Sequence, residues 1–142
     1  MSARFSFRLA AAILFLFAAG HTFGFLSFRP PSDEGRKIWQ AMQDVHFEVQ
    51  GARFSYGGFY MGFGLSITLS ILFTAFLCWW MSGMAAREPN AIAKLGWALC
   101  VLQLGSLILS AIYFAIEPAI FSGFLTLLLG WAAFRSGRPA RA

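Results

Sequence analysis

The chain has 142 residues, of which 58% are hydrophobic and 12% are charged, and its formal net charge is +5. Soluble domains have roughly 25% charged residues and leave much of the chain at the surface, so this composition excludes an ordinary soluble fold. The basic residues flank apolar runs and form no basic stripe with stacking residues, which argues against nucleic acid as a partner. At this length we expect a single transmembrane domain.

Four segments are long and apolar enough to cross a bilayer, which requires about 20 mostly apolar residues per helix. They cover residues 6–26, 57–82, 92–116 and 118–134. Helices are expected because an open sheet in lipid leaves backbone groups without hydrogen bonds, and the runs lack the alternation of barrel strands. The sequence therefore predicts an all-α membrane four-helix bundle. The Glu117–Pro118 junction leaves almost no loop, which predicts a tight antiparallel hairpin of the last two helices.

The first segment also resembles a secretory signal peptide, because Arg4 and Arg8 precede an apolar stretch that ends in small residues at 18–20. The apolar character continues through Phe23, Phe25 and Leu26, beyond the point at which a signal peptidase would cut. We therefore expect this segment to be retained as a transmembrane helix. A mature N-terminus near His21 would contradict that expectation.

The lysines and arginines predict the orientation of the helices. Those that we assign to one side of the membrane have few acidic neighbours and are Arg4, Arg8, Arg87, Lys94, Arg135, Arg138 and Arg141. On the other side, Arg29, Arg36, Lys37 and Arg53 lie among Asp33, Glu34, Asp44 and Glu48. The positive-inside rule then predicts that both termini are cytoplasmic, in a cell inner membrane, and that loop 27–56 is outside.

The outer loop, 27–56, is predicted to contain one short helix. Pro30 and Pro31 end the first span, and Ser32 is a predicted N-cap followed by two acidic residues. Beyond Gly35, apolar residues recur at helical spacing at Ile38, Trp39, Met42, Val45 and Val49. This pattern predicts a short amphipathic helix on the outer surface of the bundle or membrane.

Small residues predict where helices pack. The second span carries five of them at successive intervals of four: Gly58, Gly62, Ser66, Ser70 and Thr74. Helix association in lipid depends on close backbone approach and hydrogen bonds, so this ladder predicts a groove for another helix of the chain. The alternative is that the ladder forms a homodimer. The last span has a shorter ladder of Ser122, Thr126 and Gly130.

Polar side chains lie near the predicted outer ends of the helices. Placing polar groups in lipid costs free energy, so their presence there suggests a function. This candidate polar site consists of His21, Thr22, Arg53, Tyr56, Tyr60, Tyr113 and Glu117. An arginine with nearby tyrosines suits a phosphate or carboxylate head group, which predicts binding of a membrane lipid, a small molecule or a protein partner. The structural alternative is that these groups form only capping, interhelical and headgroup hydrogen bonds.

A small membrane enzyme is the alternative function. A histidine beside a carboxylate suits acid–base catalysis or metal ligation, so His21 and Glu117 would act on a lipid-like substrate. Motifs for phosphate loops, serine hydrolases, zinc proteases and haem attachment are absent from the sequence. The isolated Cys78 and Cys100 do not indicate a metal centre, and no cofactor is expected. Gln103 rather than a carboxylate lies at mid-membrane depth, which disfavours proton-coupled transport.

Four short motifs stand out in the first half of the chain: Gly20-His21-Thr22, Met42-Gln43, Ser55-Tyr56 and Phe59-Tyr60-Met61-Gly62-Phe63-Gly64. Together they resemble a family of small bacterial integral membrane proteins that is uncharacterised. The resemblance implies four transmembrane helices over most of the chain and implies no activity. Small multidrug transporters also have four helices, but they place an essential glutamate in the first, where this chain has no carboxylate.

Overall fold

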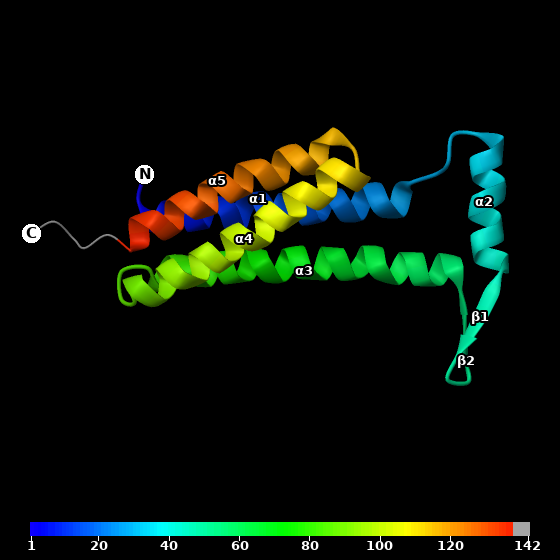
Figure 1. Ribbon diagram of the computed structural model, residues 1–142, viewed down its shortest axis with the longest axis horizontal. Helices are drawn as coiled ribbons and strands as arrows, with labels where there is room; N and C mark the ends of the chain where they lie inside the picture. Colours follow the sequence, from blue (N-terminus) through cyan, green and yellow to red (C-terminus); the bar gives the residue numbers. More distant parts are fainter. Residues whose placement is uncertain (138–142) are drawn as a thin grey trace, which may run out of the picture. The chain divides into compact units, whose positions relative to one another are not determined.

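The computed structural model describes residues 1–137, and this part of the chain is mainly helical (Figure 1). Its helices are α1 (Ala3–Ser27), α2 (Asp33–Asp44), α3 (Tyr56–Met84), α4 (Pro89–Tyr113) and α5 (Ile116–Ser136). Two short strands, β1 (His46–Val49) and β2 (Ala52–Ser55), lie between α2 and α3. Among the described residues, α1, α3, α4 and α5 are long and apolar enough to cross a membrane. The predicted helical chain with four candidate spans is confirmed.

The helix ends differ from the predicted ones most clearly around Pro118. Helix α4 ends at Tyr113 and α5 begins at Ile116, so α4 is shorter than predicted and Glu117 joins Pro118 in the first turn of α5. Proline is accommodated there because the first four backbone N–H groups of a helix have no partner within it. A carboxylate in this turn is also favoured by the helix dipole.

The chain forms two compact units. Unit 2 is Ala18–Ile71, and unit 1 contains Met1–Phe17 and the chain from Leu72 onward. Helices α1 and α3 therefore each contribute one part to each unit.

In unit 1, α4 and α5 run in opposite directions and pack along each other (Figure 1). Gly96 allows this approach, because a Cβ placed on it would lie 2.9 Å from the Cβ of Ala133 and 3.2 Å from its Cα. The ring of Phe7 from α1 closes the same contact, at 3.1 Å from that position. The thiol of Cys100 donates a hydrogen bond of 3.3 Å to the carbonyl of Thr126. Small residues and one interhelical hydrogen bond thus hold this pair together.

The core of unit 1 also includes parts of α1 and α3. Its largest buried side chains are Phe7, Leu14, Cys78, Met81, Ile92, Leu125 and Leu129. Phe17 stacks on Phe121 with ring centroids 4.8 Å apart, which joins α1 to α5. The guanidinium of Arg8 lies 5.4 Å from the ring centroid of Trp79, which joins α1 to α3 through a cation–π contact.

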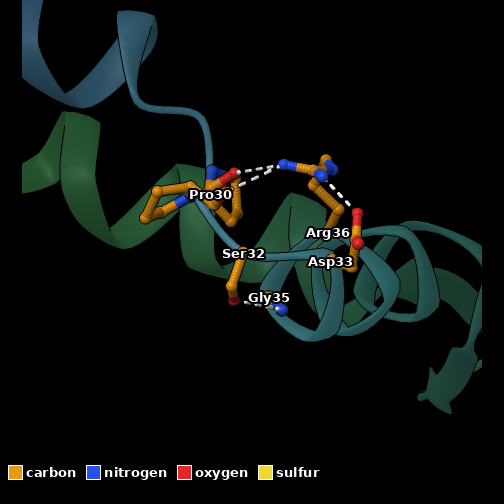
Figure 2. Close-up of polar contacts among 6 residues, drawn as sticks. Pro30, Ser32, Asp33, Gly35 and Arg36 are labelled. Atoms are coloured by element: carbon orange, nitrogen blue, oxygen red, sulfur yellow. Dashed lines mark hydrogen bonds and ion pairs between the residues drawn. The ribbon is translucent and has the colours of Figure 1, made fainter.

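Unit 2 contains α2, whose first turn is organised as the sequence predicts (Figure 2). The hydroxyl of Ser32 accepts a hydrogen bond of 3.0 Å from the backbone N–H of Gly35. Arg36 donates to the carbonyl of Pro31 at 3.0 Å and forms an ion pair with Asp33. The Ser32 contact satisfies one of the N–H groups that the start of a helix leaves unpaired, and the Arg36 contacts anchor α2 to the proline turn.

The amphipathic helix is shorter than predicted, because α2 ends at Asp44 and Val49 belongs to a strand. Strands β1 and β2 pair antiparallel, and the turn residues Gln50 and Gly51 have φ values of 51° and 81°. Positive φ at both positions is typical of a type I′ two-residue hairpin turn, and glycine adopts it without steric cost. The prediction that the helix extends to Val49 is therefore wrong, and a β-hairpin follows α2 instead.

Within unit 2 most of the small-residue ladder of α3 is exposed, and its packing against another helix or a second copy stays a prediction. Gly58, Gly62, Ser66 and Ser70 are exposed, and no atom of the surroundings lies within 4 Å of a Cβ placed on Gly62. The hydroxyls of Ser66 and Ser70 each donate a hydrogen bond of 2.9 Å to the carbonyl one turn earlier. Only Thr74, in the part of α3 that belongs to unit 1, is buried.

Helix α3 packs in unit 2 through a different face. A Cβ on Gly64 would overlap the ring of Phe25 from α1, and one on Gly57 would overlap the side chain of Gln43 from α2. Residues two apart on a helix point about 200° from each other, so Gly64 lies opposite Gly62. Spacing by four shows that small residues recur on one face of α3. It does not show that this face packs against a bulky side chain.

Candidate functional site

In unit 2, two of the predicted site residues, His21 and Thr22, meet Thr68 of α3. The Nδ1 atom of His21 and the Oγ1 atom of Thr22 each lie 3.0 Å from the Oγ1 atom of Thr68. Thr22 donates its only hydroxyl proton to the carbonyl of Ala18 at 2.8 Å. The Thr68 hydroxyl also lies 3.5 Å from the carbonyl of Gly64, and the partner that receives its single proton sets the tautomer of His21. We call these three residues the polar cluster.

A row of aromatic rings continues from the polar cluster. The ring of His21 stacks on Phe25 with centroids 5.8 Å apart, and Phe25 lies 5.3 Å from Tyr60. Tyr60 meets the edge of Trp39 at 6.0 Å, and Trp39 meets Phe28 at 6.2 Å. We call Phe25, Tyr60, Trp39 and Phe28 the aromatic row. Its members come from α1, α2, α3 and the segment that follows α1, so the aromatic row packs these parts of unit 2 against one another.

This arrangement combines two kinds of surface. The polar cluster presents an imidazole and two hydroxyls, which exchange hydrogen bonds with one another and with backbone carbonyls. The aromatic row presents ring faces and edges, and its member Tyr60 is about half exposed. A hydrogen-bonding group beside an exposed aromatic surface suits a ligand that has a polar part and an apolar part.

Arg53 and Tyr56 also belong to unit 2 but lie on its hairpin side. Arg53 is opposite Glu48 in the β1–β2 register, and Tyr56 is the first residue of α3. The ring of Tyr56 lies 4.9 Å from that of Phe47. The contacts described for Tyr56 are on the hairpin side of unit 2, and those described for His21 are with Thr68 and Phe25. That Arg53 and Tyr56 share a site with His21 stays a prediction.

Tyr113 and Glu117, the remaining predicted site residues, belong to unit 1. Tyr113 ends α4, Glu117 is in the first turn of α5, and both are exposed. The pairing of Glu117 with His21 stays a prediction. Within residues 1–137, no group of three or more His, Cys, Asp or Glu residues could hold a metal ion.

Thr68 was missed by the sequence analysis, although a signal for it exists. It follows Gly64 by one helical turn, so both lie on the face of α3 that receives α1. The sequence analysis considered the small residues spaced by four on the opposite face of α3, and Thr68 is not among them. The site is interpreted from its own geometry, since no protein-family model, curated protein or solved structure matches the chain.

Proposed function

We propose that the chain is a multi-pass inner-membrane protein that binds an amphipathic lipid with the outer half of its helices. The observation that carries this proposal is the polar cluster beside the aromatic row. A hydrogen-bonding group along the lipid, such as an ester carbonyl or a hydroxyl, would lie against His21 and Thr68, and the lipid would continue outward along the rings of Phe25 and Tyr60. Binding of this kind requires no chemical step.

The depth of the polar cluster supports this proposal. The midpoint of α1 is residue 15, six residues before His21. At about 1.5 Å per residue, His21 would lie about 9 Å from the bilayer centre if the helix is centred, well within the hydrocarbon half-thickness of about 15 Å. Polar groups at such a depth are costly and characteristically serve a function or a helix contact.

The orientation in this proposal rests on the basic residues. Arg87 lies between α3 and α4, and Arg135 lies in the last turn of α5, at the ends we assign to the cytoplasm. Arg138 and Arg141, which support the same assignment, lie outside the described residues. The loop that contains α2 and the hairpin is then outside.

Hydrogen bonding rather than net charge should select the lipid. Arg36 is engaged by Asp33, and Arg29 donates to the carbonyls of Leu26 and Phe28 at 3.2 and 2.8 Å. These guanidinium groups already have partners, so we do not expect a strong preference for anionic head groups. Lipids that carry hydroxyl, amine or phosphate groups all offer suitable hydrogen-bonding atoms.

Native mass spectrometry of the full chain, released from detergent after incubation with phosphatidylethanolamine, phosphatidylglycerol and cardiolipin, tests the proposal. We expect retained lipid in the unmodified chain and about a 2- to 10-fold weaker retention in Thr68→Val and His21→Ala, which corresponds to about 0.5–1.5 kcal/mol per hydrogen bond. Thr68→Val preserves side-chain shape, so circular dichroism should remain unchanged.

Ser66→Ala is the matched control, because Ser66 lies on the same helix and its hydroxyl donates only to its own helix in the bonds described. The proposal fails if the unmodified chain retains no lipid, or if Thr68→Val retains as much as Ser66→Ala. The enzyme alternative predicts a lipid of altered mass that disappears in both His21→Ala and Glu117→Gln.

A further inference from the structure

The β-hairpin has one aromatic face and one charged face. Phe47 pairs with Phe54, and the neighbouring pair is Glu48 with Arg53. Successive side chains of a strand point to opposite faces, so the two phenylalanines share one face and the two charged residues share the other. The rings of Phe47 and Phe54 have centroids 6.1 Å apart.

The aromatic face of the hairpin is continuous with an exposed face of α3. The ring of Phe47 meets the edge of Phe59 at 5.7 Å, and Phe59 meets Phe63 at 4.8 Å. Phe54, Phe59 and Phe63 are 47%, 54% and 59% exposed. A contiguous apolar surface of this kind indicates a partner that is itself apolar at this level.

We propose that the hairpin is a lipid-interface anchor, whose aromatic face rests on the outer headgroup layer while Glu48 and Arg53 face water. This inference rests on the membrane insertion in the proposed function, but not on the polar cluster. Two-stranded hairpins are at best marginally stable alone in water, so contact with lipid would also explain why this one is maintained.

The position of the rings along α3 supports lipid as the molecule that covers this aromatic face. Helix α3 spans 29 residues with its midpoint at residue 70, so Phe63 is seven and Phe59 eleven residues from the middle. At about 1.5 Å per residue these positions are about 10 and 16 Å from the centre, inside and at the edge of a hydrocarbon core about 30 Å thick. Phe47 packs on Phe59 and therefore lies at the membrane interface, where aromatic rings are favoured.

Charge also fits a lipid surface better than a charged protein partner. Glu48 and Arg53 lie directly opposite each other and have opposite signs, so the outward face presents little net charge. The hairpin would thus lie on bilayers irrespective of their net charge. Its aromatic face, rather than its arginine, would hold it there.

Spin labels on adjacent residues test this inference in the full chain, after Cys78→Ala and Cys100→Ala remove the native thiols. Phe54→Cys and Arg53→Cys place labels on opposite faces of one strand, so disruption of the hairpin would affect both alike. In vesicles of phosphatidylcholine and phosphatidylglycerol, we expect the label at 54 to collide mainly with oxygen dissolved in lipid. The label at 53 should collide mainly with an aqueous nickel chelate.

A third label, at Phe63→Cys, reports membrane insertion of α3 itself. Lipid accessibility at 63 with water accessibility at both 53 and 54 would overturn the anchor and leave insertion intact. Shielding of 54 from both reagents would also overturn it, in favour of a protein partner on the hairpin. Water accessibility at 63 would instead contradict the membrane placement on which the proposed function rests.

Discussion

Leu127→Lys is expected to prevent stable insertion of α5 into the membrane. Leu127 is 76% exposed and lies next to residue 126, the midpoint of α5. In a soluble protein such an exposed side chain tolerates lysine within about 0.5 kcal/mol. In a bilayer, lysine at the centre of a helix costs about 2.5–3.5 kcal/mol, so the substitution should sharply reduce the membrane-embedded yield.

The yield of protein that resists alkaline carbonate extraction measures this effect. Ile38→Lys is the matched control, because Ile38 is also exposed but lies on α2, which is not a candidate span. We expect Ile38→Lys to leave the embedded yield close to that of the unmodified chain. Equal yields for Leu127→Lys and the unmodified chain would contradict a lipid-facing position for Leu127.

Gly96→Leu is expected to separate α4 from α5 and to destabilise unit 1. The new side chain would meet Ala133 at 2.9 Å from Cβ to Cβ and 3.2 Å from Cβ to Cα, and a backbone Cα has no freedom to rotate away. Overpacking of this kind costs roughly 1–3 kcal/mol of unfolding free energy, and sometimes more. Loss of helicity during titration with sodium dodecyl sulfate measures the change.

Gly105 provides the control on the same helix, because nothing lies within 4 Å of a Cβ placed there. Gly105→Leu should leave stability unchanged or raise it by up to about 0.5–1 kcal/mol, since glycine is a poor helix former. Similar destabilisation by both substitutions would show that the Gly96 contact is not what holds α4 against α5.

The four candidate spans were predictable because a bilayer imposes a minimum apolar length, and this constraint is visible in any single segment. The start of α2 was predictable for a similar reason, since Ser32 and the acidic residues after it act within one turn. The ends of α4 and α5 were harder to predict. Around Pro118 the sequence allows either a break between helices or a first helical turn, and the structure has the second.

The hairpin and the contacts of the site were not predictable in the same way. Val45 and Val49 fit a helical spacing, while the alternation on either side of Gln50-Gly51 fits a hairpin, so the local pattern allows both. His21 and Thr68 are 47 residues apart, so their contact depends on which faces of α1 and α3 meet. Gly64 sets that choice by admitting the ring of Phe25.

Cysteine labelling in intact cells tests most directly whether the chain crosses the membrane four times with both termini in the cytoplasm. The native cysteines are replaced by alanine, and single cysteines are introduced in turn at Ser2, Gly51, Ala86, Ala115 and Gly137. A maleimide that cannot cross the membrane should label positions 51 and 115 from outside. Positions 2, 86 and 137 should react only after the membrane is permeabilised. Labelling of 51 and 115 from opposite sides, or of all five positions in intact cells, would contradict the four-span topology.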